Sequence, residues 1–272
     1  MRSISNEGIA IGKLTKAFLR TFLFASVEKK RAIFLALAIT LVIALDYWYF
    51  SASIGDERNL ESAVVARVLD GDTFDLTDGR RVRMLNINTP EKGEFGADNA
   101  KTYLKQFENK TVEISVIGRE TYGRLLARVY APNYINLNMV REGLARTLLV
   151  QDEEVKEFAR AQQEAIEGNR GVWARSANYG CLAGEIDKKD EYVEFENRCA
   201  ISLAGWTVSD ETTREYTFKT EPAERFVLYS ARGSENKTAL FWKRVNAWNN
   251  DRDALIVRDE QGKLVYYNSY GY

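Results

Sequence analysis

The sequence contains no histidine among its 272 residues. Without histidine there is no Ser-His-Asp or Cys-His nucleophile system, and no zinc site that needs an imidazole ligand. Any acid–base chemistry must therefore be carried by carboxylates, arginine, lysine, tyrosine or a bound metal ion.

Cysteine and proline are also scarce. The two cysteines, Cys181 and Cys199, cannot form a four-thiolate zinc site alone, so they are either one disulfide or two packing thiols. Three prolines and eighteen glycines exclude a collagen-like or low-complexity polymer, and 45% hydrophobic with 28% charged residues indicates a globular chain. Its length predicts two folded modules rather than one large core.

The N-terminal region combines positive charge with an apolar run. Residues 1–31 hold seven Lys or Arg against two Glu, the fourteen residues 32–45 carry no charge, and an aromatic cluster follows at 47–50. This order predicts a basic cytoplasmic segment at 1–31, a transmembrane helix at 32–51 and a linker at 52–61, with the rest of the chain outside the cytoplasm. Two other interpretations stay open: a signal peptide cleaved near the small residues 51–53, and a buried core helix.

Residues 62–175 predict a small β-barrel with helices. The expected strands cover 62–69, 74–76, 80–87, 112–117 and 124–130, and Asp78-Gly79 marks a hairpin between the second and the third. Helical periodicity is present at 100–107, 137–145 and 152–167. Five short strands with appended helices favour the OB-fold, an α+β barrel.

Four polar residues of this segment are candidates for chemistry: Asp72, Arg83, Glu91 and Arg124. Taken singly, they are a turn carboxylate, two edge-strand arginines with their guanidiniums in water, and a loop carboxylate. Together they fit phosphodiester hydrolysis, because two guanidiniums can bind the phosphate oxygens while a carboxylate deprotonates water. A hard cation held by oxygen ligands would add Lewis-acid stabilisation.

Five strings resemble the thermonuclease (staphylococcal nuclease-like) family: VLDGDTFDL at 68–76, VRMLNINTPE at 82–91, TYGRLLARVYA at 121–131, LNMVREGLA at 137–145 and GNRGVWAR at 168–175. The resemblance implies an OB-fold barrel with three helices and calcium-dependent hydrolysis of DNA and RNA that leaves 3′-phosphates. It also implies roles for residues of this chain: Asp72 as the first calcium carboxylate, Thr89 as a backbone-carbonyl ligand, Arg83 and Arg124 as phosphate-binding groups, and Glu91 as the general base.

Position 88 departs from the family pattern. Asn88 stands where the family has its second calcium carboxylate, so the site loses one negative charge. Fewer charged ligands move calcium affinity towards the range of extracellular sites, ~0.1 to 1 mM. Tyr122, in the TYGR string, is expected either to stack on a nucleic-acid base or to pack against the protein.

Residues 180–272 predict a β-sandwich. Short strands at 191–196, 207, 216–218, 226–229, 254–257 and 264–267 alternate with turn residues, and no long helical period occurs. The strings DEYVEFEN at 190–197, LAGWTVSD at 203–210 and AWNNDRDALIVRDEQGKLV at 247–265 resemble the lamin-tail domain, an immunoglobulin-like module. The resemblance implies binding or tethering rather than catalysis, with a ligand that the sequence does not identify.

These features predict a membrane-anchored, outward-facing, calcium-dependent nuclease that degrades DNA, RNA or both. The alternative is a thermonuclease fold with a weakened metal site, kept for binding nucleic acid or protein. The presence of all four candidate residues favours the enzyme. The outward orientation predicts a disulfide between Cys181 and Cys199, with two buried free thiols as the alternative.

Overall fold

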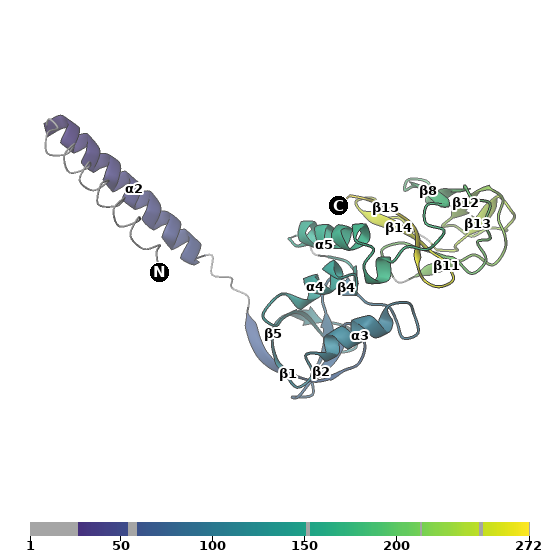
Figure 1. Cartoon of the computed structure of the whole chain (residues 1–272), viewed down its shortest axis with the longest axis horizontal. Helices are drawn as coiled ribbons and strands as arrows, with labels where there is room; N and C mark the ends of the chain where they lie inside the picture. The colour runs from purple at the N-terminus through teal and green to yellow at the C-terminus, as the bar shows by residue number, and fades with distance from the viewer. Residues whose placement is uncertain (1–26, 54–58, 151–152, 213, 245–246, 272) are drawn as a thin grey trace, which may run out of the picture. The chain divides into compact units, whose positions relative to one another are not determined.

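The computed structural model describes residues 27–53, 59–150, 153–212, 214–244 and 247–271 (Figure 1). The chain divides into two compact units, 1–58 and 59–272, and each is treated by itself. Most of the predicted basic segment at 1–31, and part of the predicted linker at 52–61, lie outside the described residues.

Helix α2 covers Val27–Ser53 and contains the whole predicted span 32–51. The segment has neither proline nor glycine, which favours an uninterrupted helix. Its large apolar side chains from 34 to 45 are exposed, and the hydroxyl of Thr40 donates to the carbonyl of Ala36 at 2.8 Å. Among the described residues, no helix is long and apolar enough to cross a membrane. The transmembrane assignment stays a prediction.

Five strands close into a barrel in the order β1-β2-β3-β6-β5. They are β1 (Leu60–Val68), β2 (Thr73–Leu76), β3 (Arg81–Met84), β5 (Thr111–Arg119) and β6 (Leu125–Tyr130). Strands β3 and β6 pair in parallel, and the other neighbours are antiparallel. Because side chains alternate along each strand, Phe74, Val82 and Leu125 lie in the barrel core. The predicted OB-fold-like barrel is confirmed.

Three helices and a two-stranded sheet accompany the barrel: α3 (Ala97–Lys105), α4 (Ile135–Arg141), α5 (Val155–Glu167), β4 (Ile87–Asn88) and β7 (Arg146–Thr147). Helix α4 ends before the predicted residue 145, because Gly143 takes a φ of +66° that leaves the helical conformation. Asn136 ties α4 to the barrel: its Oδ1 accepts from the amide of Val129 at 3.0 Å, and its Nδ2 donates to the carbonyl of Leu85 at 2.9 Å.

The C-terminal part of this unit is built from two four-stranded sheets, β11-β10-β14-β15 and β13-β12-β9-β8. The strands are β8 (Leu182–Asp187), β9 (Tyr192–Asn197), β10 (Thr207–Ser209), β11 (Glu215–Thr217), β12 (Arg225–Tyr229), β13 (Ala239–Phe241), β14 (Asp253–Arg258) and β15 (Leu264–Tyr270). Both sheets contribute to one buried core, with Phe195 and Phe226 from one and Val208 and Val257 from the other. Strands β8 and β13 are additions to the predicted set.

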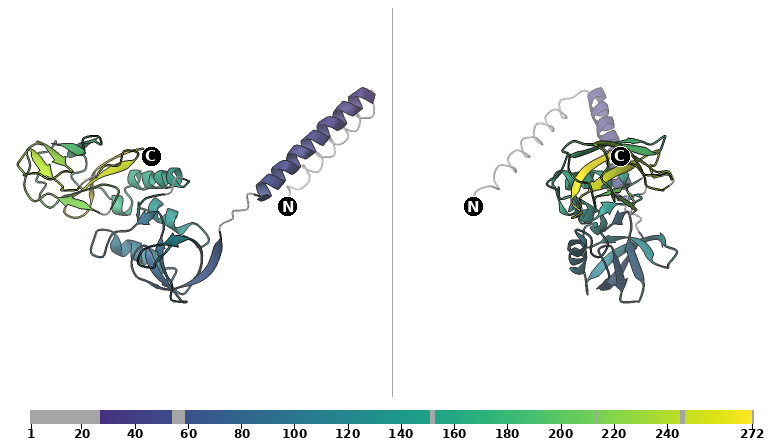
Figure 2. Two further views of the ribbon diagram at one scale, coloured as in Figure 1. Left: turned by 180° about the vertical axis from the view of Figure 1, so that it is seen from behind. Right: turned by 90° about the vertical axis from the view of Figure 1, so that its right-hand side faces the viewer.

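Helix α5 and the 3-10 turn η1 (Gly171–Trp173) cover the outer face of β14 and β15 (Figures 1 and 2). Ile166 and Trp173 form a separate buried cluster there with Ile256 and Leu264. Residues 253–257 of β14 are all buried, because one face of the strand meets the sandwich core and the other meets α5 and η1. The barrel and the sandwich therefore pack against each other within one compact unit, and the predicted boundary at 175–180 stays a prediction.

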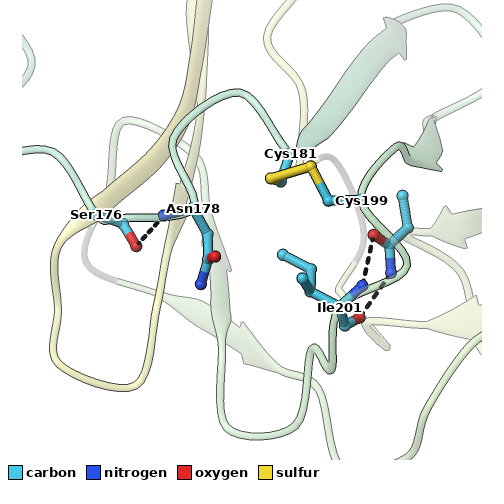
Figure 3. Close-up of a disulfide and its surroundings, with 6 residues drawn as sticks. Ser176, Asn178, Cys181, Cys199 and Ile201 are labelled. Carbon is cyan, nitrogen blue, oxygen red and sulfur yellow. Dashed lines mark hydrogen bonds between the residues drawn. A yellow bond between two sulfur atoms is a disulfide. The ribbon is translucent and has the colours of Figure 1, made fainter.

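Cys181 and Cys199 are bonded to each other, with an S–S distance of 2.13 Å and Cα atoms 5.1 Å apart (Figure 3). The bond joins the residue before β8 to the loop after β9. In that loop the side chain of Asn197 donates to the carbonyl of Ile201 at 2.7 Å and accepts from its amide at 3.3 Å. The disulfide thus links the start of the edge strand β8 to the end of its neighbour β9.

Candidate active site

Asp72 lies in the tight connection between β1 and β2, and a glycine makes its position possible. A Cβ atom on Gly71 would lie 2.6 Å from Thr89 Oγ1 and 2.7 Å from the Ala100 side chain. Only glycine therefore lets this turn approach Thr89 and helix α3 so closely. This contact explains why a glycine stands between Asp70 and Asp72.

The Asp72 carboxylate is buried, and both of its oxygens have polar partners. Its Oδ2 accepts from the Thr89 amide at 2.9 Å and from the Thr89 hydroxyl at 3.0 Å, and it lies 3.2 Å from Arg83 Nη2. Its Oδ1 accepts from the hydroxyl of Thr73 at 3.1 Å. Burial raises the pKa of Asp72, while Arg83 and the Thr89 amide act against that rise. A carboxylate whose charge is costly in this way gains from any cation that reaches it.

Arg83 connects Asp72 to Asn88. The alternation along β3 turns Val82 into the core and Arg83 to the outer surface, yet the Arg83 residue is only 9% exposed. Its Nη1 donates to the carbonyl of Met84 at 2.6 Å, and its Nη2 donates to Asn88 Oδ1 at 3.2 Å. One guanidinium nitrogen thus bridges the two side chains predicted to bind calcium.

The oxygen atoms around this guanidinium suit calcium in kind. Asp72 and Asn88 bring a carboxylate and an amide oxygen together, and Thr89 is the neighbouring residue that contacts Asp72. Hard oxygens of these types are the ligands that calcium takes in proteins. The set carries only one formal negative charge, and among the described residues no group of three or more His, Cys, Asp or Glu could hold a metal.

Arg124 lies on the same outer face of the barrel as Arg83. Arg83 pairs with Leu126 across β3 and β6, and Arg124 directly precedes β6, two residues or roughly 7 Å before Leu126. Its Nε donates to Glu120 Oε2 at 2.5 Å, and about a third of its side chain is exposed. Tyr122, in the same hairpin, is 90% exposed, so it does not pack against the protein.

Glu91 stands apart from the buried cluster. It is exposed at the start of the loop that follows β4, and its amide donates to Glu94 Oε2 at 2.7 Å. The same loop rests on the sandwich, since a Cβ atom on Gly262 would lie 2.7 Å from Phe95 Cβ. The structure therefore brings Asp72, Arg83, Asn88 and Thr89 together, with Arg124 on the same face and Glu91 two residues beyond Thr89.

A cleft of about 250 Å³ lies between the Glu91 loop and the sandwich, and residues of both line it. Pro90 and Gly93 form one side, and Arg146 and Arg258 are among the others. Arg258 Nη1 donates to the carbonyls of Val172 at 2.5 Å and Gly262 at 3.0 Å. Burial first, and then the nearby Arg146, lower the pKa of Arg258. The sequence gives no signal for this cleft, because its two sides come from separate modules.

A second group of polar contacts, which the sequence does not predict, centres on Glu154. Its Oε2 accepts from Arg128 Nε at 3.0 Å, from Arg128 Nη2 at 2.8 Å and from Asn86 Nδ2 at 2.7 Å. Arg128 lies on the outer face of β6, four residues after Arg124, which directly precedes the strand. The alternation of arginines along TYGRLLARVYA is the signal that could have identified it, since residues of equal parity share one face of a strand.

A buried cluster of a carboxylate, an arginine and an amide on an OB-fold-like barrel is compatible with an enzyme that cleaves phosphodiester bonds. The sequence profile of the family described as "Staphylococcal nuclease homologue" matches residues 81–175. An "Uncharacterized endonuclease" of Escherichia coli O157:H7 is 39% identical over 119 residues, which are 40% of this chain and 75% of that protein. The chain belongs to the staphylococcal nuclease family and is a phosphodiester-hydrolysing endonuclease.

Two further relatives extend the comparison. "Micrococcal nuclease" of Shigella flexneri is 30% identical over 158 residues, covering 51% of this chain and 83% of that protein. "Endonuclease YhcR" of Bacillus subtilis is 27% identical over 217 residues, covering 68% of this chain but 17% of that protein. The match to the Bacillus subtilis endonuclease is longer than the 95 residues that the family profile covers, 81–175. Similarity to that protein therefore extends beyond the segment that the profile matches.

Proposed function

We propose that this endonuclease cleaves DNA, RNA or both at the cluster of Asp72, Arg83 and Asn88, with Ca²⁺ as its metal ion. The observation that carries the proposal is the position of Arg83 Nη2, 3.2 Å from Asp72 Oδ2 and 3.2 Å from Asn88 Oδ1. Asp72 Oδ2 and Asn88 Oδ1, which are suited to a cation, thus both contact the Arg83 guanidinium, which is suited to a phosphate.

Asp72, Asn88 and the carbonyl of Thr89 would hold the calcium ion. When bound, the ion would supply Lewis-acid stabilisation of negative charge on the phosphate oxygens. Thr89 fixes the Asp72 carboxylate through its amide and hydroxyl, so this ligand is already oriented. Because Asn88 is neutral, we expect half-saturation at ~0.1 to 1 mM calcium, the range of extracellular sites.

Arg83 and Arg124 would bind the phosphate, and each must first leave a carboxylate. Three groups lie within 3.2 Å of Asp72 Oδ2, and Arg83 is the one that is not part of the Thr89 scaffold. Arg83 would leave Asp72 Oδ2 to bind a substrate phosphate, while Asp72 would keep its contacts with Thr89 and serve as a ligand for the ion. Arg124 would likewise exchange Glu120 for phosphate oxygens, which a guanidinium binds in a bidentate manner.

Glu91 would act as the general base. It is exposed, it follows Thr89 by two residues, and its loop is fixed by the contact of its amide with Glu94. Its exposed carboxylate would accept a proton from a water molecule that attacks a phosphate held by the arginines.

Cleavage assays on the full chain test this proposal. Single-stranded DNA, duplex DNA and RNA should each be incubated with millimolar Ca²⁺ and with a chelator. We expect cleavage of at least one substrate with Ca²⁺ and its loss in chelator. Binding without cleavage of any substrate would favour the alternative binding module. Undiminished cleavage in chelator would remove calcium from the proposal while leaving the nuclease assignment intact.

We further propose that α2 anchors the chain in a membrane, with residues 59–272 outside the cytoplasm. The charge-free run 32–45, its exposed apolar side chains and the basic residues before it support this orientation. The Cys181–Cys199 bond also supports it, because disulfides persist outside the cytoplasm. Protease added to intact cells should degrade residues 59–272. Complete protection of that unit in cells that express the chain would contradict the orientation.

For the C-terminal sandwich we propose the lamin-tail, immunoglobulin-like identity. Two four-stranded sheets around one core support it, together with the LAGWTVSD and AWNNDRDALIVRDEQGKLV strings. Such a module would bind or tether rather than catalyse. An experimental structure with a strand order that no immunoglobulin-like fold has would contradict this identity.

A further inference from the structure

A groove of about 580 Å³ lies in the C-terminal sandwich, away from the Asp72 cluster. It is lined by Arg214 and Glu215 at the start of β11, and by Trp242, Lys243 and Arg244 directly after β13. The lining holds three cations and one carboxylate, and because Arg244 is paired with Asp210 the groove keeps a formal charge of +1.

The groove is a fixed part of the sandwich. The amides of Trp242 and Arg244 donate to the carbonyls of Tyr229 at 2.8 Å and Ser230 at 2.6 Å. Lys243, between them, has a φ of +61°, a conformation that a lysine keeps only when its surroundings impose it. The backbone that presents these three side chains is therefore held against β12 and its following turn.

The side chains of the groove differ in their contacts and in their exposure to solvent. Arg244 Nη1 lies 2.7 Å from Asp210 Oδ2, and the Arg244 guanidinium carbon lies 5.4 Å from the centre of the Trp242 ring. The Trp242 indole also meets Trp248 edge to face, at a centroid distance of 5.9 Å. Arg244 is thus neutralised and supports the half-buried indole, while Lys243 and Arg214 are exposed.

A supported indole beside two exposed cations has the chemistry of a single-stranded nucleic-acid site. Bases stack on aromatic rings irrespective of sequence, and lysine and arginine contact the phosphates. A duplex hides its bases, so it could use the cations but not the indole. We propose that this groove binds a single-stranded segment of the nucleic acid that flanks the cleaved bond.

The groove adjoins the 250 Å³ cleft beside the Glu91 loop. Glu215 lines both the groove and the 250 Å³ cleft, and Pro90 and Gly93 line the same cleft beside Glu91. This inference rests on the proposed nuclease function, because it concerns the same substrate.

Another cavity of the sandwich has the wrong charge for this role. It has a volume of about 790 Å³, and its ionisable lining is Glu185, Glu194, Glu196, Arg198 and Arg225, a formal charge of −1. Both arginines are paired with Glu196, at 3.0 Å and 2.5 Å. Phosphates would meet the two remaining glutamates there, so the Trp242 groove is the better site for nucleic acid.

Fluorescence anisotropy on the full chain in chelator tests the groove. The probe is a labelled 20-nucleotide single strand, compared with the duplex of the same sequence. We expect Arg214→Ala/Lys243→Ala to weaken single-strand binding about tenfold and to reduce the slope of log K against log salt by about 1.4, the value for two phosphate contacts. Trp242→Leu should weaken single-strand binding about tenfold with little effect on the duplex, and Trp242→Phe should restore most of it.

Lys219→Ala/Lys237→Ala is the matched control, because both lysines are exposed in the same sandwich and the charge change is identical. We expect this variant to bind within twofold of the parent. Equal losses in the two double variants, or equal losses of single strand and duplex on Trp242→Leu, would overturn the groove.

Substrate length separates this inference from the nuclease function. Arg214→Ala/Lys243→Ala should lower kcat/KM for a 40-nucleotide single strand about tenfold and leave that for a tetranucleotide unchanged, because the short substrate does not reach the groove. Equal rates on the long strand for parent and variant would overturn the groove while the nuclease stands. A parent chain that cleaves neither substrate would overturn the nuclease function, and the anisotropy result would then decide the groove alone.

Discussion

The indole of Trp173 meets the ring of Tyr267 edge to face, with centroids 5.4 Å apart and ring planes at 79°. Trp173 belongs to the GNRGVWAR string of the nuclease, and Tyr267 belongs to the last strand of the sandwich. Trp173 is fully buried, and its neighbours Ile256 and Leu264 also come from the sandwich. The GNRGVWAR string, which resembles the nuclease family, therefore has part of its packing supplied by the second module.

Removing the Trp173 side chain should destabilise both modules at once. We expect Trp173→Ala to lower the free energy of unfolding by about 3 to 5 kcal/mol, the usual loss for a buried aromatic side chain. Denaturant unfolding followed by circular dichroism measures this. Tyr122→Ala is the control, because Tyr122 is 90% exposed and its loss should change stability by less than about 0.5 kcal/mol. Similar stabilities of the two variants would mean that the packing of Trp173 in η1 against the sandwich does not stabilise the fold.

The shared packing also explains which parts of the fold were predictable. The barrel strands carry alternating patterns and an Asp-Gly hairpin, so local chemistry is enough to find them. In β14 the run Ala254 to Val257 is apolar at every position, which indicates a strand buried on both faces but does not say what covers it. The cover is α5 and η1, from a segment about 90 residues earlier, and no local pattern records that distance.

The sequence is enough to predict which residues belong to the candidate site, but not which of them contact each other. Asp72, Arg83 and Asn88 were identified as separate contributors, and the structure joins them through one guanidinium nitrogen. Arg124 was expected at a phosphate, but without a ligand it contacts Glu120. Glu154 was overlooked because its partner Arg128 lies 26 residues earlier, and only the folded barrel brings the two together.

Glu91→Gln should lower the cleavage rate by about 10² or more, the scale of a lost general base, with nearly unchanged binding of nucleic acid. Glu94→Gln is a matched control in the same loop, because its amide oxygen can still accept from the Glu91 amide. We expect it to cleave at close to the parent rate. Single-turnover rates decide the matter: a Glu91→Gln rate within threefold of the parent would exclude Glu91 as the base.

Arg83 and Arg124 should differ in their effect on stability. Arg83→Ala leaves a buried Asp72 without its cationic partner, so we expect a loss of about 3 kcal/mol together with the loss of activity. Arg124→Ala breaks a partly exposed ion pair, so we expect at most about 1 kcal/mol with a comparable loss of activity. Paired measurements of unfolding and kcat/KM test this. Full activity in either variant would remove that arginine from the site.

Asp253 should make stability depend on pH between about 4 and 6. The side chain is fully buried, and burial raises its pKa to about 6 from 3.8, although three backbone amides donate to it. The folded state then holds the proton more tightly than the unfolded state, so this group lowers the free energy of unfolding as pH rises through that window. The size is on the order of 3 kcal/mol.

Asp253→Asn removes this titration, so unfolding measured at pH 4, 5 and 6 should show a flatter or rising profile relative to the parent. Asp251→Asn, at an exposed position two residues away, should keep the parent profile. If the parent and Asp253→Asn lose stability in parallel over this range, then another group is responsible for the pH dependence.

Asn88→Asp tests whether position 88 binds calcium. A carboxylate in place of the amide should lower the calcium needed for half-maximal activity about tenfold, or ~1.4 kcal/mol. Without calcium, carboxylates at 72 and 88 would lie on either side of one Arg83 nitrogen, and their repulsion should lower the melting temperature. Added calcium should therefore raise the melting temperature of Asn88→Asp more than that of the parent. Asn133→Asp, an exposed loop position with the same change in charge, should follow the parent in both measurements. An unchanged calcium midpoint and an unchanged thermal shift in Asn88→Asp would mean that Asp72, with backbone or water oxygens, holds the ion without position 88.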